Sequence, residues 1–176
     1  TELDLAALVA PGRVVLADAG SVPLRTGGVD AVVCSMALML VDDPDAAIAE
    51  VARLLRIGAR FVALLPATAP LTTRDRIRYA RLLAALRLRR LPFRHQRVLG
   101  DCRPLLAPAG LTVVGAERRR FAHRFADPDD GLWWLRSLYL PGLDQRRWRA
   151  AQRVTSRWTG TSIGIPLRRV VATKQG

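Results

Sequence analysis

The chain has 176 residues, half of them hydrophobic, which is enough for one domain with a buried core and excludes a largely disordered polypeptide. Its longest apolar stretch, from Ala31 to Val41 with one serine, is too short to span a bilayer, and the first residues lack the pattern of a secretory signal. Two cysteines make no disulfide framework, and two histidines lack the Cys or carboxylate spacing of a metal site. We therefore expect a cytoplasmic protein without a bound metal.

The formal net charge of +13 is unevenly distributed along the chain. Residues 1–70 carry five basic and eight acidic side chains, a net of −3, whereas residues 71–176 carry 23 basic and seven acidic ones, a net of +16. All of the 28 basic residues except Lys174 are Arg. Such asymmetry is typical of a protein with an anionic partner, but Arg is also a good helix former that suits solvent-facing positions. We favour the second interpretation.

Strands and a helix alternate in the first part of the sequence. Short apolar, β-branched runs predict strands at residues 13–19, 29–37 and 60–65. The second run, VDAVVCSMA, suits a buried parallel strand. Between the last two runs, Asp43 or Asp45 can cap a helix that ends at Gly58. This spacing of strands and helix predicts βαβ units, and hence an α/β fold with a parallel sheet.

The second part of the sequence is more basic and more helical. Residues 73–91 form a predicted amphipathic helix that carries seven Arg and is terminated by Pro92. Residues 129–157 are predicted to be mostly helical and divided by Pro141-Gly142. The remaining predicted elements are a short helix at residues 101–109 and strands at residues 111–116 and 167–173.

Several of these segments, in this order, resemble the class I S-adenosylmethionine-dependent methyltransferases that act on small molecules. ADAGSVPL at residues 17–24 resembles the family's strand that ends in DA before a turn, and residues 29–61 resemble its next strand, helix and strand. LLAPAGLTVV at residues 105–114 and LRRVVATK near the end resemble its last two strands. The resemblance implies a Rossmann-like α/β methyltransferase sheet flanked by helices, with a helical insertion after the fifth-strand equivalent, in one partial domain over residues 1–176.

The same resemblance implies an S-adenosylmethionine site at the carboxyl ends of the parallel strands, where open α/β sheets bind ligands. Asp18 would accept a hydrogen bond from the exocyclic amine of adenine, and the backbone N–H of Ala19 would donate to the ring. Cys34 and Ser35 would lie below the methionine part, where small side chains permit close approach. Asp4 would accept both ribose hydroxyls. Judged singly, a strand-end Asp is more commonly a turn former or helix cap, and a lone Cys a small core residue.

The family's first strand and its glycine-rich loop, commonly DxGxGxG, have no counterpart in this sequence. Gly27-Gly28 lies between predicted strands and is read as a turn. Three explanations compete: a fragment of a longer enzyme, a misassigned start, and a degenerate descendant whose gap is filled in another way. We favour a truncated sequence of enzymatic ancestry, which would be a methyltransferase or an inactive fragment of one.

Methyl transfer from a sulfonium is an in-line displacement, in which the protein mainly aligns the reactants. A general base is needed only if the acceptor must lose a proton, and we assign that role to neither His95 nor His123. The resemblance makes residues 71–110 and 121–160 the helical substrate-side segments. Their aromatic side chains suit a small apolar or aromatic metabolite: Trp133, Trp134, Tyr139 and Trp148. Because Trp133 and Trp134 are adjacent, we expect one to pack in the core and the other to be free.

Two other functions stay open at this point. Clusters such as Arg118-Arg119-Arg120 would suit an Arg-rich nucleic-acid-binding or RNA-modifying protein of methyltransferase ancestry, although the sequence contains no recognised nucleic-acid module. The helix at residues 73–91 has Arg on one side and Leu on the other, which would suit a membrane surface. We favour neither partner over a small-molecule substrate, and the sequence does not fix the oligomeric state.

Overall fold

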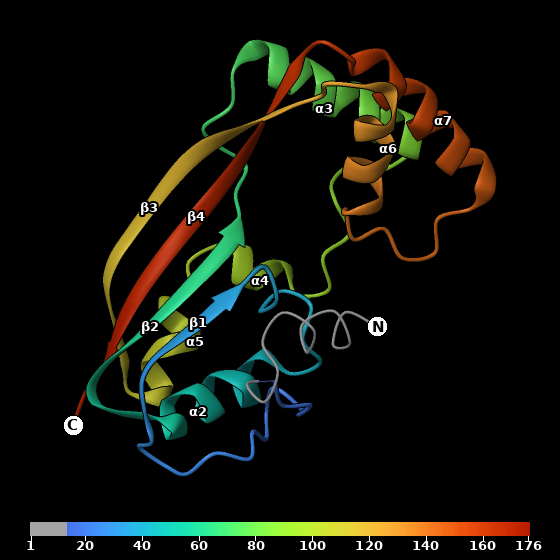
Figure 1. The fold of residues 1–176 in the computed structure, drawn as a ribbon. Helices are drawn as coiled ribbons and strands as arrows, with labels where there is room; N and C mark the ends of the chain where they lie inside the picture. Colours follow the sequence, from blue (N-terminus) through green and yellow to red (C-terminus); the bar gives the residue numbers. More distant parts are fainter. Residues whose placement is uncertain (1–13) are drawn as a thin grey trace.

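The computed structural model describes residues 14–176, which form a mixed α/β fold (Figure 1). Four strands make one sheet in the order β1-β2-β4-β3. The strands are β1 (Val29–Ser35), β2 (Leu55–Pro66), β3 (Leu111–Arg124) and β4 (Ser162–Lys174). The helices are α2 (Pro44–Leu54), α3 (Thr73–Leu86), α4 (Gln96–Leu99), α5 (Arg103–Leu106), α6 (Pro128–Arg136) and α7 (Gln145–Thr155), with short 3-10 turns at Ala107–Ala109 and Ser156–Trp158.

The sheet is mixed, so the prediction of a parallel sheet is correct for one pair of strands only. β1 and β2 are parallel and are connected through α2. β4 is antiparallel to both of its neighbours, β2 and β3. The connection between β3 and β4 explains their antiparallel pairing. It contains α6 and α7, and both helices lie at the end of the sheet where β3 ends (Figure 1). The chain must therefore re-enter the sheet from that same end.

The strand predicted at residues 13–19 is wrong for the part that the structure describes. Residues 14–17 have no regular structure, and one isolated bridge pairs Asp18 with Ser21. Val15 and Leu16 are 58% and 80% exposed. A strand needs a neighbour to satisfy its backbone groups and a surface to cover its apolar side chains. Within residues 14–176 this segment has neither.

Among the described strands, β1 lies at the edge of the sheet, and it is not the fully buried strand that its composition predicts. Val32 and Cys34 pack against the core, while the alternate side chains on the other face are exposed. Val33 on that face is 69% exposed and lies opposite Val62 of β2. The helices that contact this part of the sheet, α2, α4 and α5, all contribute to the core on the first face, so no described helix covers the second.

α2 ends four residues before the predicted stop at Gly58. Asp43 caps its start by accepting two backbone N–H groups of the first turn, as predicted. After Leu54 the chain passes directly into β2, and Gly58 has a φ of +78° near the start of that strand, where the register with β1 shifts. Gly58 therefore serves a bulge inside a strand, which also needs a positive φ, and not a helix end.

β3 and β4 are much longer than predicted, and we call their paired length the β3–β4 ladder. Pairing runs from Leu111 opposite Lys174 to Arg124 opposite Ser162. The added part of β3 reads ERRRFAHR, and this charged sequence lacks the apolar pattern from which strands are predicted. It becomes a strand because β4 pairs with it along its whole length. β2 stops earlier, at Pro66 opposite Leu167, so the ladder extends beyond the rest of the sheet.

α3 begins at the predicted residue but ends at Leu86, five residues before the predicted end. Arg87 adopts the left-handed conformation, with a φ of 54°. The N–H of Leu88 donates to the carbonyl of Leu83 at 2.9 Å, which is the hydrogen bond of a Schellman motif. Leu88 then packs against buried side chains, and this contact explains why the chain leaves the helix before Pro92.

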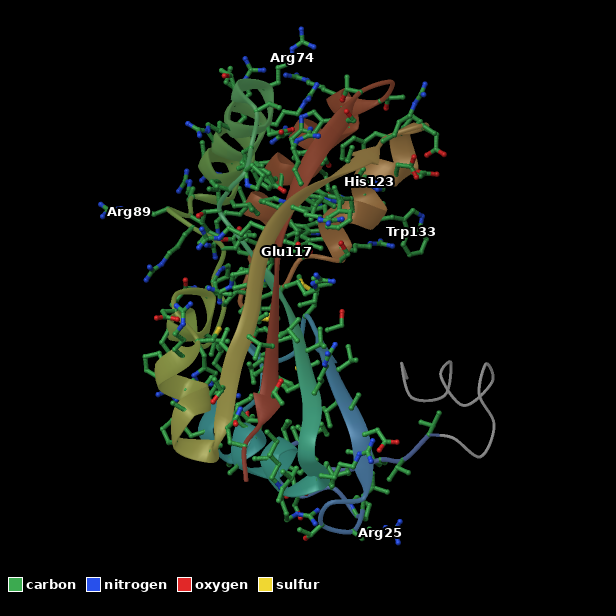
Figure 2. The ribbon with its side chains drawn as sticks, turned by 90° about the vertical axis from the view of Figure 1, so that its left-hand side faces the viewer. Arg25, Arg74, Arg89, Glu117, His123 and Trp133 are labelled. Carbon is green, nitrogen blue, oxygen red and sulfur yellow. The ribbon has the colours of Figure 1, made fainter. Side chains whose placement is uncertain are left out.

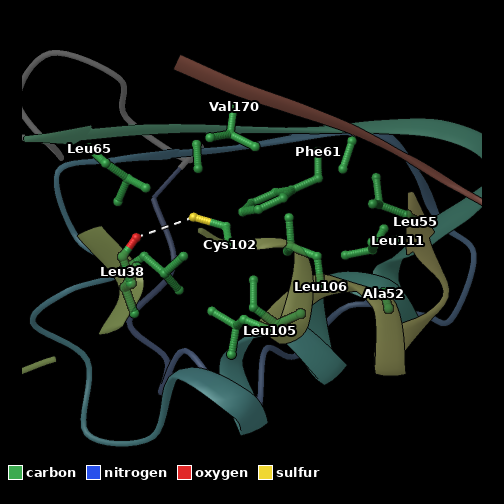
Figure 3. Close-up of a cluster of buried hydrophobic side chains, with 14 of the residues drawn as sticks. Leu38, Ala52, Leu55, Phe61, Leu65, Cys102, Leu105, Leu106, Leu111 and Val170 are labelled. Atoms are coloured by element: carbon green, nitrogen blue, oxygen red, sulfur yellow. Dashed lines mark hydrogen bonds between the residues drawn. The ribbon is translucent and has the colours of Figure 1, made fainter. Parts of the chain in front are cut away.

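Two separate clusters of buried side chains divide the molecule into two regions. In the sheet region, aliphatic side chains and Phe61 fill the space between the sheet and helices α2, α4 and α5 (Figure 3). Cys102 belongs to this core, and its Sγ lies 3.2 Å from the carbonyl oxygen of Val98. In the helical lobe, α3, α6 and α7 pack around the far end of the β3–β4 ladder. The lobe's core is rich in aromatic side chains: Tyr79, Phe125, Trp134, Trp148 and Trp158.

Candidate functional site

The carboxyl end of β1 is followed by a sharp turn in the backbone. Ser35, the last residue of the strand, is exposed. Met36 has a φ of +55°, which is uncommon for a residue other than glycine. Its N–H donates to the carbonyl of Leu64 in β2 at 2.8 Å, and the chain then buries Leu38 and Met39. Strained backbone of this kind is concentrated at functional sites, so the turn marks this edge of the sheet as a candidate.

Cys34 precedes this turn and is held in the core of the sheet region. Its side chain is half-buried and packs against the buried cluster. Burial raises the pKa of the Cys34 thiol, although the backbone around Leu38 and Ala37 partly opposes that change. The thiol is therefore neutral at physiological pH, and the residue contributes small size and not a reactive thiolate.

Asp18 and Ala19 lie in a tight turn, not at the end of a strand. The N–H of Gly20 donates to Oδ1 of Asp18 at 2.7 Å, and the N–H of Ser21 donates to the Asp18 carbonyl at 3.0 Å. This turn lines a pocket of about 330 Å³ together with the start of α2 and the loop before it. The lining residues are Ala17, Asp18, Ala19, Gly20, Leu40, Val41, Asp42, Asp43 and Ala46.

One ion pair on α2 holds the segment that contains this turn. Glu50 Oε1 accepts the N–H of Val22 at 2.7 Å, and Arg53 donates from Nη2 to the carbonyls of Val22 and Leu24 at 3.0 and 2.8 Å. Arg53 Nε lies 2.7 Å from Glu50 Oε2. The hydrogen bonds from Arg53 and from the Val22 N–H lower the pKa of Glu50 to about 2. Sequence reasoning missed this pair, whose only signal is an ordinary i, i+3 pair on a helix.

The structure therefore brings together only part of the predicted set. Asp18 and Ala19 share one pocket, but Cys34 and Ser35 do not line it. Asp4 lies outside the described residues. The pocket offers the carboxylates of Asp18, Asp42 and Asp43, backbone N–H groups, and apolar side chains such as Leu40 and Val41 that an adenine ring could contact. Among the described residues, none of the lining groups is a cation that could bind the carboxylate of a methionine part.

The aromatic side chains separate as the sequence predicts for Trp133 and Trp134. Trp134 is buried in the lobe core, where its ring centroid lies 6.0 Å from Phe125 and 5.5 Å from Trp158. Trp133 is 66% exposed and points away from the lobe (Figure 2). Phe121 is 50% exposed and Tyr139 40%, so these two rings and Trp133 are the free aromatic surfaces of the substrate-side segments.

Neither histidine is placed as an evident general base. The backbone N–H of His95 donates to the carbonyl of Met39 at 3.2 Å, which ties the start of α4 to the loop after β1. His123 stacks edge-on against Phe125, with ring centroids 4.8 Å apart. The Nε2 atoms of both rings are buried without a hydrogen-bond partner in the described part of the chain.

Within residues 14–176, no three His, Cys, Asp or Glu side chains are grouped as metal ligands would be. Over the same residues, the helices are all too short or too polar to cross a bilayer.

Comparison with known proteins gives one family match and several fold matches. Residues 2–63 match the family model described as a methyltransferase domain. No curated protein sequence matches the chain at a significant level.

The fold is shared with solved structures of low sequence identity. The YcgJ protein of Bacillus subtilis is 18% identical, with a TM-score of 0.56 over 90% of this chain and 69% of its own. A Bacillus halodurans C-125 protein assigned as a methyltransferase is 13% identical, with a TM-score of 0.55 over 91% and 76%. The [4+2]-cyclase SpnF is 18% identical, with a TM-score of 0.58 over 99% of this chain but only 62% of its own. Together, the domain match and the shared fold confirm the resemblance of this chain to the class I S-adenosylmethionine-dependent methyltransferases.

Proposed function

We propose that the chain binds S-adenosylmethionine at the carboxyl edge of β1 and transfers its methyl group to a small apolar or aromatic metabolite. The observation that carries the proposal is the pocket beside Asp18 and Ala19, which lies within the residues matched to a methyltransferase domain. The same matched range contains the other three predicted cofactor residues, Asp4, Cys34 and Ser35.

Asp18 has the hydrogen-bonding capacity that an adenine amine requires. Its Oδ1 accepts the Gly20 N–H, and among the described residues its Oδ2 has no hydrogen-bond partner. An ionised carboxylate can accept further hydrogen bonds at that oxygen. Ala19 would donate its N–H to the ring, and Leu40 and Val41 would cover the ring's faces.

The remaining residues would orient the reacting groups. S-adenosylmethionine carries an activated methyl group, so the protein contributes mainly by alignment and by exclusion of water. Ser35 and Met36 are exposed at the end of β1, and the strained turn at Met36 fixes their direction. Trp133 and Tyr139 supply exposed aromatic surface for an acceptor in the helical substrate-side segments at residues 71–110 and 121–160.

Calorimetry with S-adenosylmethionine tests the binding step. Asp18→Asn keeps an oxygen for the turn at Gly20 but places an amide N–H₂ group toward the adenine amine. We expect at least about ten-fold weaker binding, because a hydrogen bond to a charged group is lost. Asp30→Asn is the matched control, since the Asp30 side chain is 79% exposed at the opposite end of β1 and pairs only with Arg56 among the described residues. Equal weakening in both variants, or no binding by the folded parent chain, would contradict the proposal.

Methyl transfer needs its own assay, because fold does not determine reaction. The solved [4+2]-cyclase shares this fold, and its name describes a cyclisation. Release of labelled methyl groups to a panel of small aromatic and apolar acceptors therefore has to be measured separately from binding. If S-adenosylmethionine bound but no acceptor were methylated, the proposed cofactor site would be supported and the proposed methyl transfer would be contradicted.

A further inference from the structure

A second cavity, larger than the candidate cofactor pocket, lies in the helical lobe, away from that pocket. It has a volume of about 850 Å³ and lies where the first turn of α3 meets the far end of the β3–β4 ladder. Four arginines contribute to its walls, together with hydroxyl groups. The lining residues are Thr72, Thr73, Arg74, Asp75, Arg78, Arg120, Arg124, Gly160, Thr161 and Ser162.

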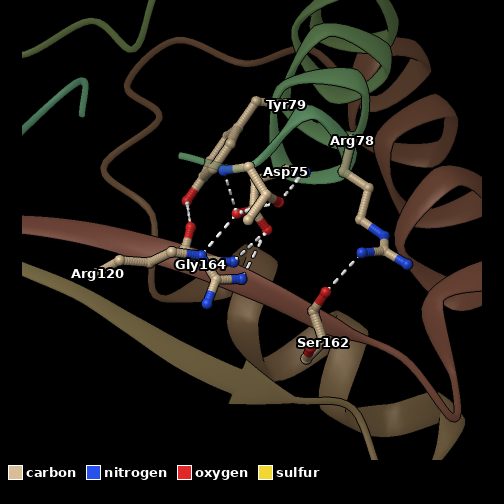
Figure 4. Close-up of polar contacts among 7 residues, drawn as sticks. Asp75, Arg78, Tyr79, Arg120, Ser162 and Gly164 are labelled. Atoms are coloured by element: carbon tan, nitrogen blue, oxygen red, sulfur yellow. Dashed lines mark hydrogen bonds and ion pairs between the residues drawn. The ribbon is translucent and has the colours of Figure 1, made fainter. Parts of the chain in front are cut away.

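Asp75, the one carboxylate in this wall, is fully engaged with its neighbours (Figure 4). Its oxygens accept from Arg120 Nε at 2.7 Å and Arg120 Nη2 at 3.1 Å, and from the N–H of Gly164 at 2.7 Å. Thr72 donates to it from both its N–H, at 2.9 Å, and its Oγ1, at 2.7 Å. Asp75 is 1% exposed, and the Arg120 guanidinium holds its pKa well below the usual range. Its charge therefore neutralises Arg120 and no other arginine.

The other three arginines leave a net positive charge around the cavity. Arg78 Nη1 donates to the carbonyl of Ser162 at 2.6 Å, which positions its guanidinium without neutralising it. Arg74 and Arg124 are exposed and have no carboxylate partner within residues 14–176. Figure 2 shows Arg74 at the outer end of the lobe. Like charges brought together in this way repel one another, so the arrangement costs stability in the absence of an anion.

The charge pattern of α3 adds to this cost. A helix favours acidic residues in its first turn and basic residues in its last, because of its dipole. α3 has Arg74 in its first turn and no basic residue in its last. Asp75 is the one acidic residue of that first turn, and Arg120 already pairs with it. A local arrangement that opposes stability, with no compensation nearby, is typical of a functional site.

We propose that this arginine pocket binds a phosphate-bearing small molecule. Guanidinium groups match the planar, bidentate geometry of phosphate oxygens, and the hydroxyls of Thr73 and Ser162 can donate to the same group. The pocket is separate from the proposed cofactor site. Ser35 pairs with Leu64, Leu64 pairs with Arg169, and Ser162 lies seven residues further along β4. At ~3.4 Å per residue, Ser35 and the arginine pocket are roughly 24 Å apart along the strands.

Calorimetry of the full chain with inorganic pyrophosphate tests this proposal. The variant Arg74→Gln/Arg124→Gln removes two charges from the pocket without touching the Asp75 network. The control Arg89→Gln/Arg153→Gln removes two charges from exposed positions of the same lobe outside the pocket. We expect saturable binding by the parent chain, weakening of at least about ten-fold in the pocket variant, and little change in the control, because bidentate contacts are local.

Three results would overturn the proposal. The parent chain could fail to bind pyrophosphate, or both double variants could weaken binding equally, which would indicate a diffuse field and no site. A generic single-stranded RNA could bind with an affinity that both double variants reduce alike while pyrophosphate fails to compete, which would indicate nucleic-acid binding across the basic surface. S-adenosylmethionine binding is measured in parallel, and it should be unchanged in the pocket variant whether or not pyrophosphate binds.

Discussion

The sheet region and the helical lobe bury their hydrophobic cores in different ways. The sheet region packs aliphatic side chains and Phe61 on one face of the sheet, and its other face, with Val33 69% exposed, has no described helix on it. The lobe encloses aromatic side chains between three helices and the end of the β3–β4 ladder. The core of the sheet region thus covers one face of the sheet only, whereas the core of the lobe is enclosed between the helices and the end of the ladder. The difference shows that the lobe has a core of its own, although its strands are continuous with the sheet.

In each region, a buried carboxylate joins distant segments of the chain and supports one of the two pockets. In the sheet region, Glu50 with Arg53 holds the loop that contains Asp18. In the lobe, Asp75 with Arg120 joins α3 to both strands of the ladder. Glu50 supports the candidate cofactor pocket, and Asp75 supports the arginine pocket. In both regions a buried acid orders the site through hydrogen bonds to other protein groups.

The largest expected effect tests whether the two regions unfold together. Phe61→Ala should lower the free energy of unfolding by about 3–5 kcal/mol, because Phe61 is fully buried at the centre of the sheet region. Tryptophan fluorescence reads out the lobe alone, since all four tryptophans are in it: Trp133, Trp134, Trp148 and Trp158. The continuous ladder predicts that the fluorescence transition shifts with the circular-dichroism transition.

Val33→Ala is the matched control for that experiment. Because Val33 is exposed, the change should stay within about 0.5 kcal/mol. If Phe61→Ala moved the circular-dichroism transition and left the fluorescence transition in place, the two regions would be independent folding units.

Asp75→Ala should destabilise the lobe by about 3 kcal/mol, because it leaves Arg120 and the Gly164 N–H without their acceptor. The pH dependence follows from the lowered pKa of Asp75. The carboxylate stabilises the folded chain above the unfolded pKa of about 3.9, and this contribution is lost as the pH falls through the lower folded pKa. Denaturation curves between pH 7 and 2 measure it. If the stability of Asp75→Ala fell with decreasing pH as steeply as that of the parent chain, Asp75 would not be the source of this pH dependence.

A smaller effect is expected for Glu50→Gln, which should weaken S-adenosylmethionine binding several-fold by loosening the loop at residues 18–26. Because the folded pKa of Glu50 is lowered to about 2, the ion pair's contribution to stability is fully present above the unfolded pKa of about 4.3 and is lost as the pH falls through about 2. Calorimetry at pH 7 measures the affinity, and pyrophosphate binding should not change. Loss of both affinities would instead indicate general unfolding.

The smallest effect on stability is expected for Trp133→Ala, within about 0.5 kcal/mol, because the ring is 66% exposed and the Arg136 guanidinium lies 5.7 Å from its centroid. If Trp133 binds the acceptor, the variant should raise the KM for that acceptor without a change in S-adenosylmethionine affinity. The half-buried Leu132 and Arg136, which lies over the ring, are unsuitable controls, so the exposed Arg149→Ala on α7 is used instead. An unchanged KM would remove Trp133 from the acceptor site.

Local signals in the sequence predict much of this fold. The core of β1, the second half of β2, the start of α2 and the Pro141-Gly142 break in the helical lobe all follow from periodicity, capping and turn residues. The long charged half of β3 could not be predicted in this way, because its strand structure comes from pairing with β4. The same holds for the end of α3, where the burial of Leu88 decides the helix boundary.

The candidate site is less predictable, because its supports join residues far apart in the chain. Glu50 contacts Val22 across 28 residues, and Arg120 contacts Asp75 across 45. Resemblance to a family led to Asp18 and Ala19, and the structure places both in one pocket. It also corrects their setting, since they lie in a turn, whereas a strand was predicted.

The unbroken backbone pairing of β3 with β4 restricts how the two proposed sites can move relative to each other. A flexible linker would let the lobe swing about a point, but two paired strands resist such rotation along their whole length. The register shift between Val113 and Gly115 is the one irregularity in this pairing, and it lies at the sheet end of the ladder. Any change in the separation of the two pockets would therefore be a slight bending or twisting of the whole paired segment, with the lobe carried as a rigid body.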